Sequence, residues 1–145
     1  MRGGTENVAA IVGFGRAAQL LAASRAEDAR TLAAHKQAML ALLTRPGITV
    51  NSPPDCTAPS VLNIALHGVE AEGMLFHLGR AGFCVSMGSA CNSESVEPSH
   101  VIRAIGLAPA DARGCIRISF GHGQTDADCV ALAAKILELA AQLRE

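Results

Sequence analysis

The sequence predicts an α+β fold, a two-layer sandwich in which helices cover one side of a small, mostly antiparallel sheet, preceded by a long helix. Two observations predict it. Half of the 145 residues are hydrophobic, with much Ala and Leu but no Trp and no Tyr, which suits closely packed helices. Short runs rich in Val and Ile also alternate with runs of helical period, and the short connections between them favour antiparallel strand pairing.

The long helix is expected at residues 8–43, which contain no proline and no glycine after Gly15. Ala, Leu and other good helix formers fill this stretch, so it predicts one long helix or two nearly collinear ones. The Arg-Pro-Gly sequence at residues 45–47 ends it. We therefore expect a single domain, with an N-terminal segment and long helix over residues 1–45 and a small α+β part over residues 46–145.

The small part is expected to hold short strands and helices bounded by turn residues. Gly82 and Gly106 stop two of the helices, Pro98 suits the first turn of another, and Thr125 or Asp126 can cap the last. The predicted strands cover residues 48–50, 60–66, 83–85 and 115–120, and the predicted helices cover residues 70–80, 98–105 and a final stretch from about residue 126.

Composition and charge exclude several classes of function. The net charge is −1 with acids and bases mixed along the chain, so no basic stripe indicates nucleic-acid binding. Apolar stretches are too short for a membrane helix, and the N-terminus does not resemble a signal peptide. The five cysteines have no regular spacing, which indicates neither a disulfide framework nor a metal site and favours a cytoplasmic, reducing setting; they are Cys56, Cys84, Cys91, Cys115 and Cys129.

Cys91 is the leading candidate for chemistry. It lies within residues 86–96, a run of small and polar side chains that is unsuited to a core. A reactive thiol must be exposed and able to ionise, and such a segment favours exposure. An incidental loop cysteine is the alternative. His100 can assist the thiol or simply cap the following helix, whereas the other four cysteines are interpreted as loop or packing residues.

Arg117 is the second candidate, on the predicted strand of residues 115–120. Its neighbours Ile116 and Ile118 should face the opposite side of the sheet. The planar guanidinium group of an arginine can bind a carboxylate through two hydrogen bonds. The alternative is a surface arginine that pairs with a nearby acid.

Two further segments carry polar residues near or in the long helix. Residues 2–7, Arg-Gly-Gly-Thr-Glu-Asn, precede a helix start, where glycines, the Thr5 hydroxyl and free amides can hold a phosphate. The alternative is an ordinary frayed terminus. His35 and Lys36 lie inside the long helix, and we interpret them as part of its solvated face.

Taken together, these segments resemble the cysteine desulfurases, pyridoxal-phosphate (PLP) enzymes of the class V aminotransferase group. The resemblance runs along nearly the whole chain in order. It rests on Arg-Gly-Gly-Thr-Glu-Asn at residues 2–7, Asn63 in a family-like strand, Gly-Ser-Ala-Cys at 88–91, Pro-Ser-His-Val at 98–101, Ala-Ile-Gly-Leu at 104–107 and Ile-Arg-Ile-Ser at 116–119.

The resemblance implies the small C-terminal domain of a PLP fold-type-I enzyme and a role for each matched residue. Cys91 would take sulfur from PLP-bound L-cysteine as a persulfide, and alanine would leave. Arg117 and Asn63 would bind the substrate, and Thr5 would contact the cofactor phosphate across a dimer interface. The persulfide would then pass to a sulfur-acceptor or scaffold protein for iron–sulfur cluster or thio-cofactor assembly.

The chain also departs from the family pattern. The family's PLP lysine, an aspartate and a stacking histidine lie upstream of the Arg-Gly-Gly-Thr motif, so the large PLP-binding domain is expected to be absent and PLP is not expected to bind this chain alone. Lys36 lies after that motif and cannot substitute. Residues 121–126 replace the family's usual Gly-Arg-x-Thr-Thr pattern with Gly-His-Gly-Gln-Thr-Asp.

Three functional hypotheses remain open at this point. The chain is part of a cysteine desulfurase and inactive by itself, or a stand-alone persulfide carrier or binding module, or one half of a split desulfurase that works with a large-domain partner chain. Whether it is a fragment or a natural short protein stays open as well. Without the large domain, the apolar face of the long helix would be left uncovered, which predicts either self-association as a homodimer or a rearranged first helix.

Overall fold

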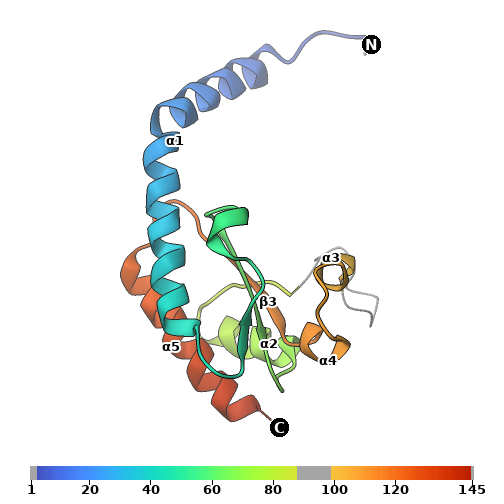
Figure 1. The fold of residues 1–145 in the computed structure, drawn as a ribbon. Helices are drawn as coiled ribbons and strands as arrows, with labels where there is room; N and C mark the ends of the chain where they lie inside the picture. Colours follow the sequence, from blue (N-terminus) through green and yellow to red (C-terminus); the bar gives the residue numbers. More distant parts are fainter. Residues whose placement is uncertain (1–2, 88–98, 145) are drawn as a thin grey trace.

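The computed structural model describes residues 3–87 and 99–144 and confirms the α+β fold, with a three-stranded antiparallel sheet and covering helices (Figure 1). The strand order is β1-β2-β3. The elements are α1 (Val8–Leu43), β1 (Ile48–Val50), the 3-10 helix η1 (Pro54–Cys56), β2 (Val61–Leu66), α2 (Ala71–Arg80), α3 (His100–Ala104), α4 (Pro109–Ala112), β3 (Cys115–Ser119) and α5 (Asp126–Leu143).

The register of the sheet separates an apolar face from a mixed one. Ile48 lies opposite Leu66 on the β1–β2 ladder, and Ile64 lies opposite Ile116 on the β2–β3 ladder. Because side chains alternate along a strand, the residues between them point to the other face. The apolar face carries Leu62, Ile64, Leu66, Ile116 and Ile118, all buried, and the other face carries Asn63, Ala65, Cys115 and Arg117.

Three helices cover the apolar face. The second half of α1 packs along α5, and α5 also packs along α2. Their largest fully buried side chains complete the core with those of the sheet; they are Met39, Leu43, Met74, Leu78 and Ile136. The short helices α3 and α4 lie apart from these, to the other side of the sheet (Figure 1), where Ile102 and Ala112 pack on Ala65 and Cys115.

The long helix is continuous, but its two halves have different surroundings. Residues 8–23 are exposed, including Phe14 at 77% exposure, and this half projects beyond the sheet (Figure 1). Burial begins only near residue 32, where α1 meets α5. Among the described residues, no helix has both the length and the apolar character to cross a membrane.

The prediction that His35 and Lys36 lie on a solvated helical face is wrong. They are 6% and 2% exposed. His35 is covered because its Nδ1 lies 2.9 Å from Asp126 Oδ1 at the start of α5. Lys36 is covered by the segment after β1, since its Nζ donates to Thr57 Oγ1 at 2.5 Å and to the Ala58 carbonyl at 3.3 Å.

The strand predicted at residues 83–85 is not present. This part of the chain instead meets the sheet at a single antiparallel bridge between Ser86 and Arg117. The helix predicted from residue 98 begins at His100, with Ser99 as its cap, and Pro98 lies outside the described residues. The short helices η1 and α4 were not predicted, although Pro54 and Pro109 each begin one of them.

Candidate functional site

Asn63 and Arg117 lie side by side on the mixed face of the sheet. They are directly opposite each other in the β2–β3 register. The Arg117 N–H and carbonyl both bond to Ser86, on the far side of β3, at 2.6 and 3.0 Å. The Asn63–Arg117 pair is therefore of the non-hydrogen-bonded type, in which the two Cα atoms are about 4.5 Å apart and the side chains are close.

The guanidinium group of Arg117 has no partner among the described residues. The residue is exposed. Within residues 3–87 and 99–144, no carboxylate lies within ion-pair distance of it and no hydrogen bond holds its side chain, so the alternative of a surface arginine paired with an acid finds no support in that part of the chain. An exposed cation beside an amide is an arrangement that binds a carboxylate.

Asn63 is held in place by two residues that the sequence reasoning did not single out. The Asn51 Nδ2 donates to Asn63 Oδ1 at 2.7 Å, and the Asn51 N–H donates to the Asn63 carbonyl at 2.9 Å. The Ser52 hydroxyl accepts from the Asn63 N–H at 2.7 Å. Because Asn51 and Ser52 precede two prolines, their sequence indicates only a turn. The usable signal was that Asn51 continues the alternation of β1 on the face that carries Asn63.

Cys115 lies next to this pair of asparagines and is a packing residue, as predicted. It is 3% exposed, and burial raises the pKa of its thiol, partly offset by a hydrogen bond from Asn51 and reinforced by the nearby charge of Asp111. A buried thiol with a raised pKa is a poor nucleophile. Cys115 therefore supports the site without reacting in it.

The Cys91 prediction falls outside the described residues. The described residues on either side of that segment are each held by contacts in the structure. Ser86, shortly before that segment, bonds to Arg117. Ser99, directly after it, caps α3 through its hydroxyl, and α3 packs on the mixed face of the sheet through Ile102.

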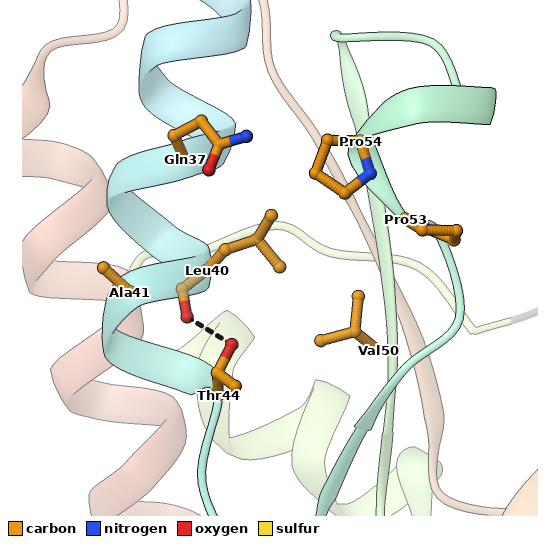
Figure 2. A pocket seen from close by; sticks show the side chains of 7 residues that line it. All are labelled: Gln37, Leu40, Ala41, Thr44, Val50, Pro53 and Pro54. Carbon is orange, nitrogen blue, oxygen red and sulfur yellow. Dashed lines mark hydrogen bonds between the residues drawn. The ribbon is translucent and has the colours of Figure 1, made fainter.

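A separate groove of about 500 Å³ lies between α1 and the segment formed by β1 and η1 (Figure 2). It is lined by Gln37, Leu40, Ala41, Thr44, Val50, Pro53 and Pro54. None of these side chains is ionisable or nucleophilic at neutral pH except for the weakly reactive Thr44 hydroxyl, which donates to the Leu40 carbonyl at 2.7 Å. The groove has no chemistry of its own and contains none of the predicted site residues.

The comparison with protein families gives the assignment. Residues 1–132 match the family model of the aminotransferases of class V. The chain belongs to the class V aminotransferase family.

Within this family the chain is most informatively compared with cysteine desulfurases. It is 36% identical over 144 residues to "Cysteine desulfurase IscS" of Methanosarcina thermophila and 38% identical over 146 residues to a cysteine desulfurase of Gluconacetobacter diazotrophicus, covering 99% of this chain each time. The solved structure of a NifS-like protein superposes with a TM-score of 0.82 at 25% identity over 98% of this chain. The chain spans only 36% of the length of each of these three proteins.

PLP enzymes of this family need a lysine for their cofactor, and the two lysines of this class V aminotransferase chain do not fit that role. The Lys36 ammonium group is enclosed by Thr57 and Ala58, and burial lowers its pKa. Lys135 forms an ion pair with Glu138 along α5 at 2.6 Å. Both lysines lie on helices that cover the apolar face of the sheet, whereas Asn63 and Arg117 lie on the other face.

Thr5 is not brought together with the other site residues. It is exposed and precedes α1, at the tip of the projecting half of that helix (Figure 1). A helix of 36 residues is about 54 Å long, and only its far end reaches the core. A contact between Thr5 and the site of the same chain is therefore not part of this fold.

Proposed function

We propose that this chain is the C-terminal part of a cysteine desulfurase, in which Cys91 takes the sulfur atom of L-cysteine as a persulfide and L-alanine is released. The observation that carries the proposal is the exposed Arg117 beside Asn63, joined by a backbone bridge to the segment that leads to Cys91. The relatives named cysteine desulfurases support the same assignment.

In this proposal Arg117 binds the α-carboxylate of L-cysteine through its two-pronged guanidinium group, and Asn63 adds a hydrogen bond. The Cys91 thiolate attacks the substrate sulfur, so that an S–S bond forms and the C–S bond breaks. The electron pair of that bond stays with the carbon, which takes a proton to give alanine. PLP, held by a polypeptide other than residues 1–145, supplies the electron sink for this cleavage.

The remaining roles follow from the same proposal. The persulfide passes from Cys91 to an acceptor or scaffold protein that builds iron–sulfur clusters or thio-cofactors in the cytoplasm. Thr5, distant from Asn63 in its own chain, contacts the cofactor phosphate of a neighbouring subunit in a homodimer. Because neither lysine is available for PLP, the chain has no desulfurase activity by itself.

Replacement of Arg117 tests the carboxylate site directly. L-Alanine is titrated into the isotope-labelled chain, and the dissociation constant is read from the chemical shifts of the Asn63 side-chain amide. Arg117→Met should weaken binding about ten- to hundredfold, since a hydrogen bond to a charged group contributes about 1.5–3 kcal/mol. Arg80→Met, on α2, is the matched control and should bind as the unaltered chain does. Equal affinities in all three proteins would refute the site.

The split-enzyme hypothesis is kept as a second candidate because of one observation. The projecting half of α1 is apolar and uncovered, with Val8, Ile11, Val12, Phe14 and Leu21 all exposed, which favours a partner polypeptide. Copurification from the native host with a lysine-bearing class V aminotransferase chain would support it. Recovery of the chain with no such partner would speak against it.

A further inference from the structure

We propose that Asn51 is a positioning residue, which fixes the Asn63 side-chain amide with its NH2 end toward Arg117. The Asn63–Arg117 pair then offers hydrogen-bond donors to a ligand, as binding of a carboxylate requires. The inference rests on the proposed function, because the ligand is the carboxylate of the same substrate.

The strand order sets the direction of the Asn63 amide. Asn63 lies on β2, the central strand, with the β1 side of the sheet on one flank and β3 on the other. Its Oδ1 accepts from Asn51 Nδ2, at 2.7 Å, on the β1 side. Because Asn51 occupies the Asn63 Oδ1, the Nδ2 group is the end of the Asn63 amide that has no hydrogen bond among the described residues, and Arg117 lies directly opposite Asn63 in register.

A second contact fixes the orientation of Asn51 itself. Its Nδ2 also lies 3.5 Å from Cys115 Sγ, and the Cys115 thiol donates in turn to the Asp111 carbonyl at 3.7 Å. Reversing the Asn51 amide would place its oxygen against the oxygen of Asn63. The contacts to Cys115 and Asn63 therefore both use the Nδ2 end of Asn51.

The orientation of the Asn51 amide carries an energetic cost. Its Oδ1 is buried and has no hydrogen-bond partner among the described residues. An unsatisfied buried acceptor is unusual in a native protein and calls for an explanation. Here Asn51 Nδ2 donates hydrogen bonds to Asn63 Oδ1 and Cys115 Sγ. As a result, Asn51 Oδ1 is left without a hydrogen-bond donor among the described residues.

The experiment is the L-alanine titration followed through the Asn63 side-chain amide. Asn51→Ala should weaken binding about three- to tenfold, because Asn63 then turns freely and offers its donor only part of the time. For the variants that lack the Asn63 side-chain amide, the backbone amide of Arg117 reports binding instead. Asn63→Ala should weaken binding by a similar factor, and adding Asn51→Ala to it should cause no further loss. Thr49→Ala removes the hydrogen bond between Thr49 and His67. Because Thr49 lies on β1, the strand directly before Asn51, this variant is the control for general loosening of that strand.

A second variant keeps the test decisive if Asn51→Ala folds poorly. Asn51→Asp puts an oxygen in place of the donor, so the Asn63 amide should reverse, bond to the new carboxylate through its NH2 group and stop responding to L-alanine. The protein-wide amide spectrum shows whether each variant is folded.

The outcomes separate this inference from the proposed function. If Arg117→Met binds L-alanine as well as the unaltered chain does, the carboxylate site is wrong and the inference fails with it. If binding depends on Arg117 but is unchanged by Asn51→Ala, only the inference is overturned. Additive losses from Asn51→Ala and Asn63→Ala, or an equal loss from Thr49→Ala, would also overturn it.

Discussion

At the scale of single residues, Lys36 is the most deeply buried charged side chain among the described residues. Its ammonium group fastens the segment after β1 to α1, through Thr57 and the Ala58 carbonyl. Burial lowers its pKa from the ordinary 10.5, and the nearby Cys56 opposes that shift. Lys36 thus joins two parts of the fold while its charge is poorly solvated.

The lowered pKa predicts a rise in stability at alkaline pH. Between the folded pKa and 10.5 the unfolded chain binds the Lys36 proton more readily than the folded chain does. The free energy of unfolding contributed by this group therefore increases as the pH rises through that window. The free energy of unfolding is measured by urea denaturation for the unaltered chain and for Lys36→Met at several pH values. As the pH rises to 10.5, the unaltered chain should gain stability relative to Lys36→Met. A constant or falling difference would contradict the assignment, and Lys135→Met controls for surface lysines.

The sequence predicted Arg117 as an exposed strand residue because Ile116 and Ile118 alternate with it. It did not predict that Asn63 would lie opposite, since strand register depends on how distant segments pair. The burial of Lys36 was missed for a similar reason. Much of α1 is apolar on every side, so its sequence does not reveal which face α5 and residues 53–58 will cover.

At the scale of elements, the turn before β3 depends on Gly114. A Cβ atom built on Gly114 would lie 2.1 Å from the Leu66 carbonyl oxygen and 2.9 Å from that of Val69. The Gly114 carbonyl also accepts from the Leu66 N–H at 3.0 Å. The end of β2 and the start of β3 can approach each other this closely only because residue 114 has no side chain.

Gly114→Ala should therefore lower the free energy of unfolding by about 1–3 kcal/mol, the usual cost of forcing extra volume into a packed site. Gly79→Ala is the matched control, since Gly79 lies inside α2 with open space around it and alanine favours a helix by up to about 1 kcal/mol. Chemical denaturation midpoints give both values. Similar stabilities for the two variants would show that the backbone before β3 moves to accommodate the methyl group.

Most elements were predictable because their signals are local. No glycine or proline follows Gly15 until Pro46. The last helix begins at Asp126, and Thr125 caps it through reciprocal hydrogen bonds with Asp128. The prediction of a strand at residues 83–85 was wrong. A short apolar run contains no local signal that shows whether it will pair with the edge strand of a sheet. Only Ser86 reaches β3, through one bridge.

At the scale of the whole molecule, the projecting half of α1 is apolar but is not covered by the rest of the described chain. Its exposed apolar residues point in several directions around the helix rather than along one stripe, with Phe14 and Leu20 among them. A helix that is apolar all round normally lies inside a larger structure. This half of α1 is therefore expected to be covered by other polypeptide.

In isolation the chain should self-associate through this surface. Sedimentation velocity should show dimers or larger species, and the double variant Phe14→Glu with Leu21→Glu should shift the chain toward the monomer. Phe76→Glu, at an exposed position on α2, should not. A monomeric unaltered chain, or an equal effect of Phe76→Glu, would contradict a role for the projecting half of α1.

The most direct measurement of the proposed function is the mass of the peptide that contains Cys91. The chain is incubated with PLP and L-cysteine labelled with heavy sulfur, with and without the lysine-bearing remainder of a cysteine desulfurase. We predict one labelled sulfur atom on Cys91, and an equal amount of alanine, only when that remainder is present. Alanine formed by the chain alone, or alanine formed with the remainder while Cys91 stays unlabelled, would contradict the account.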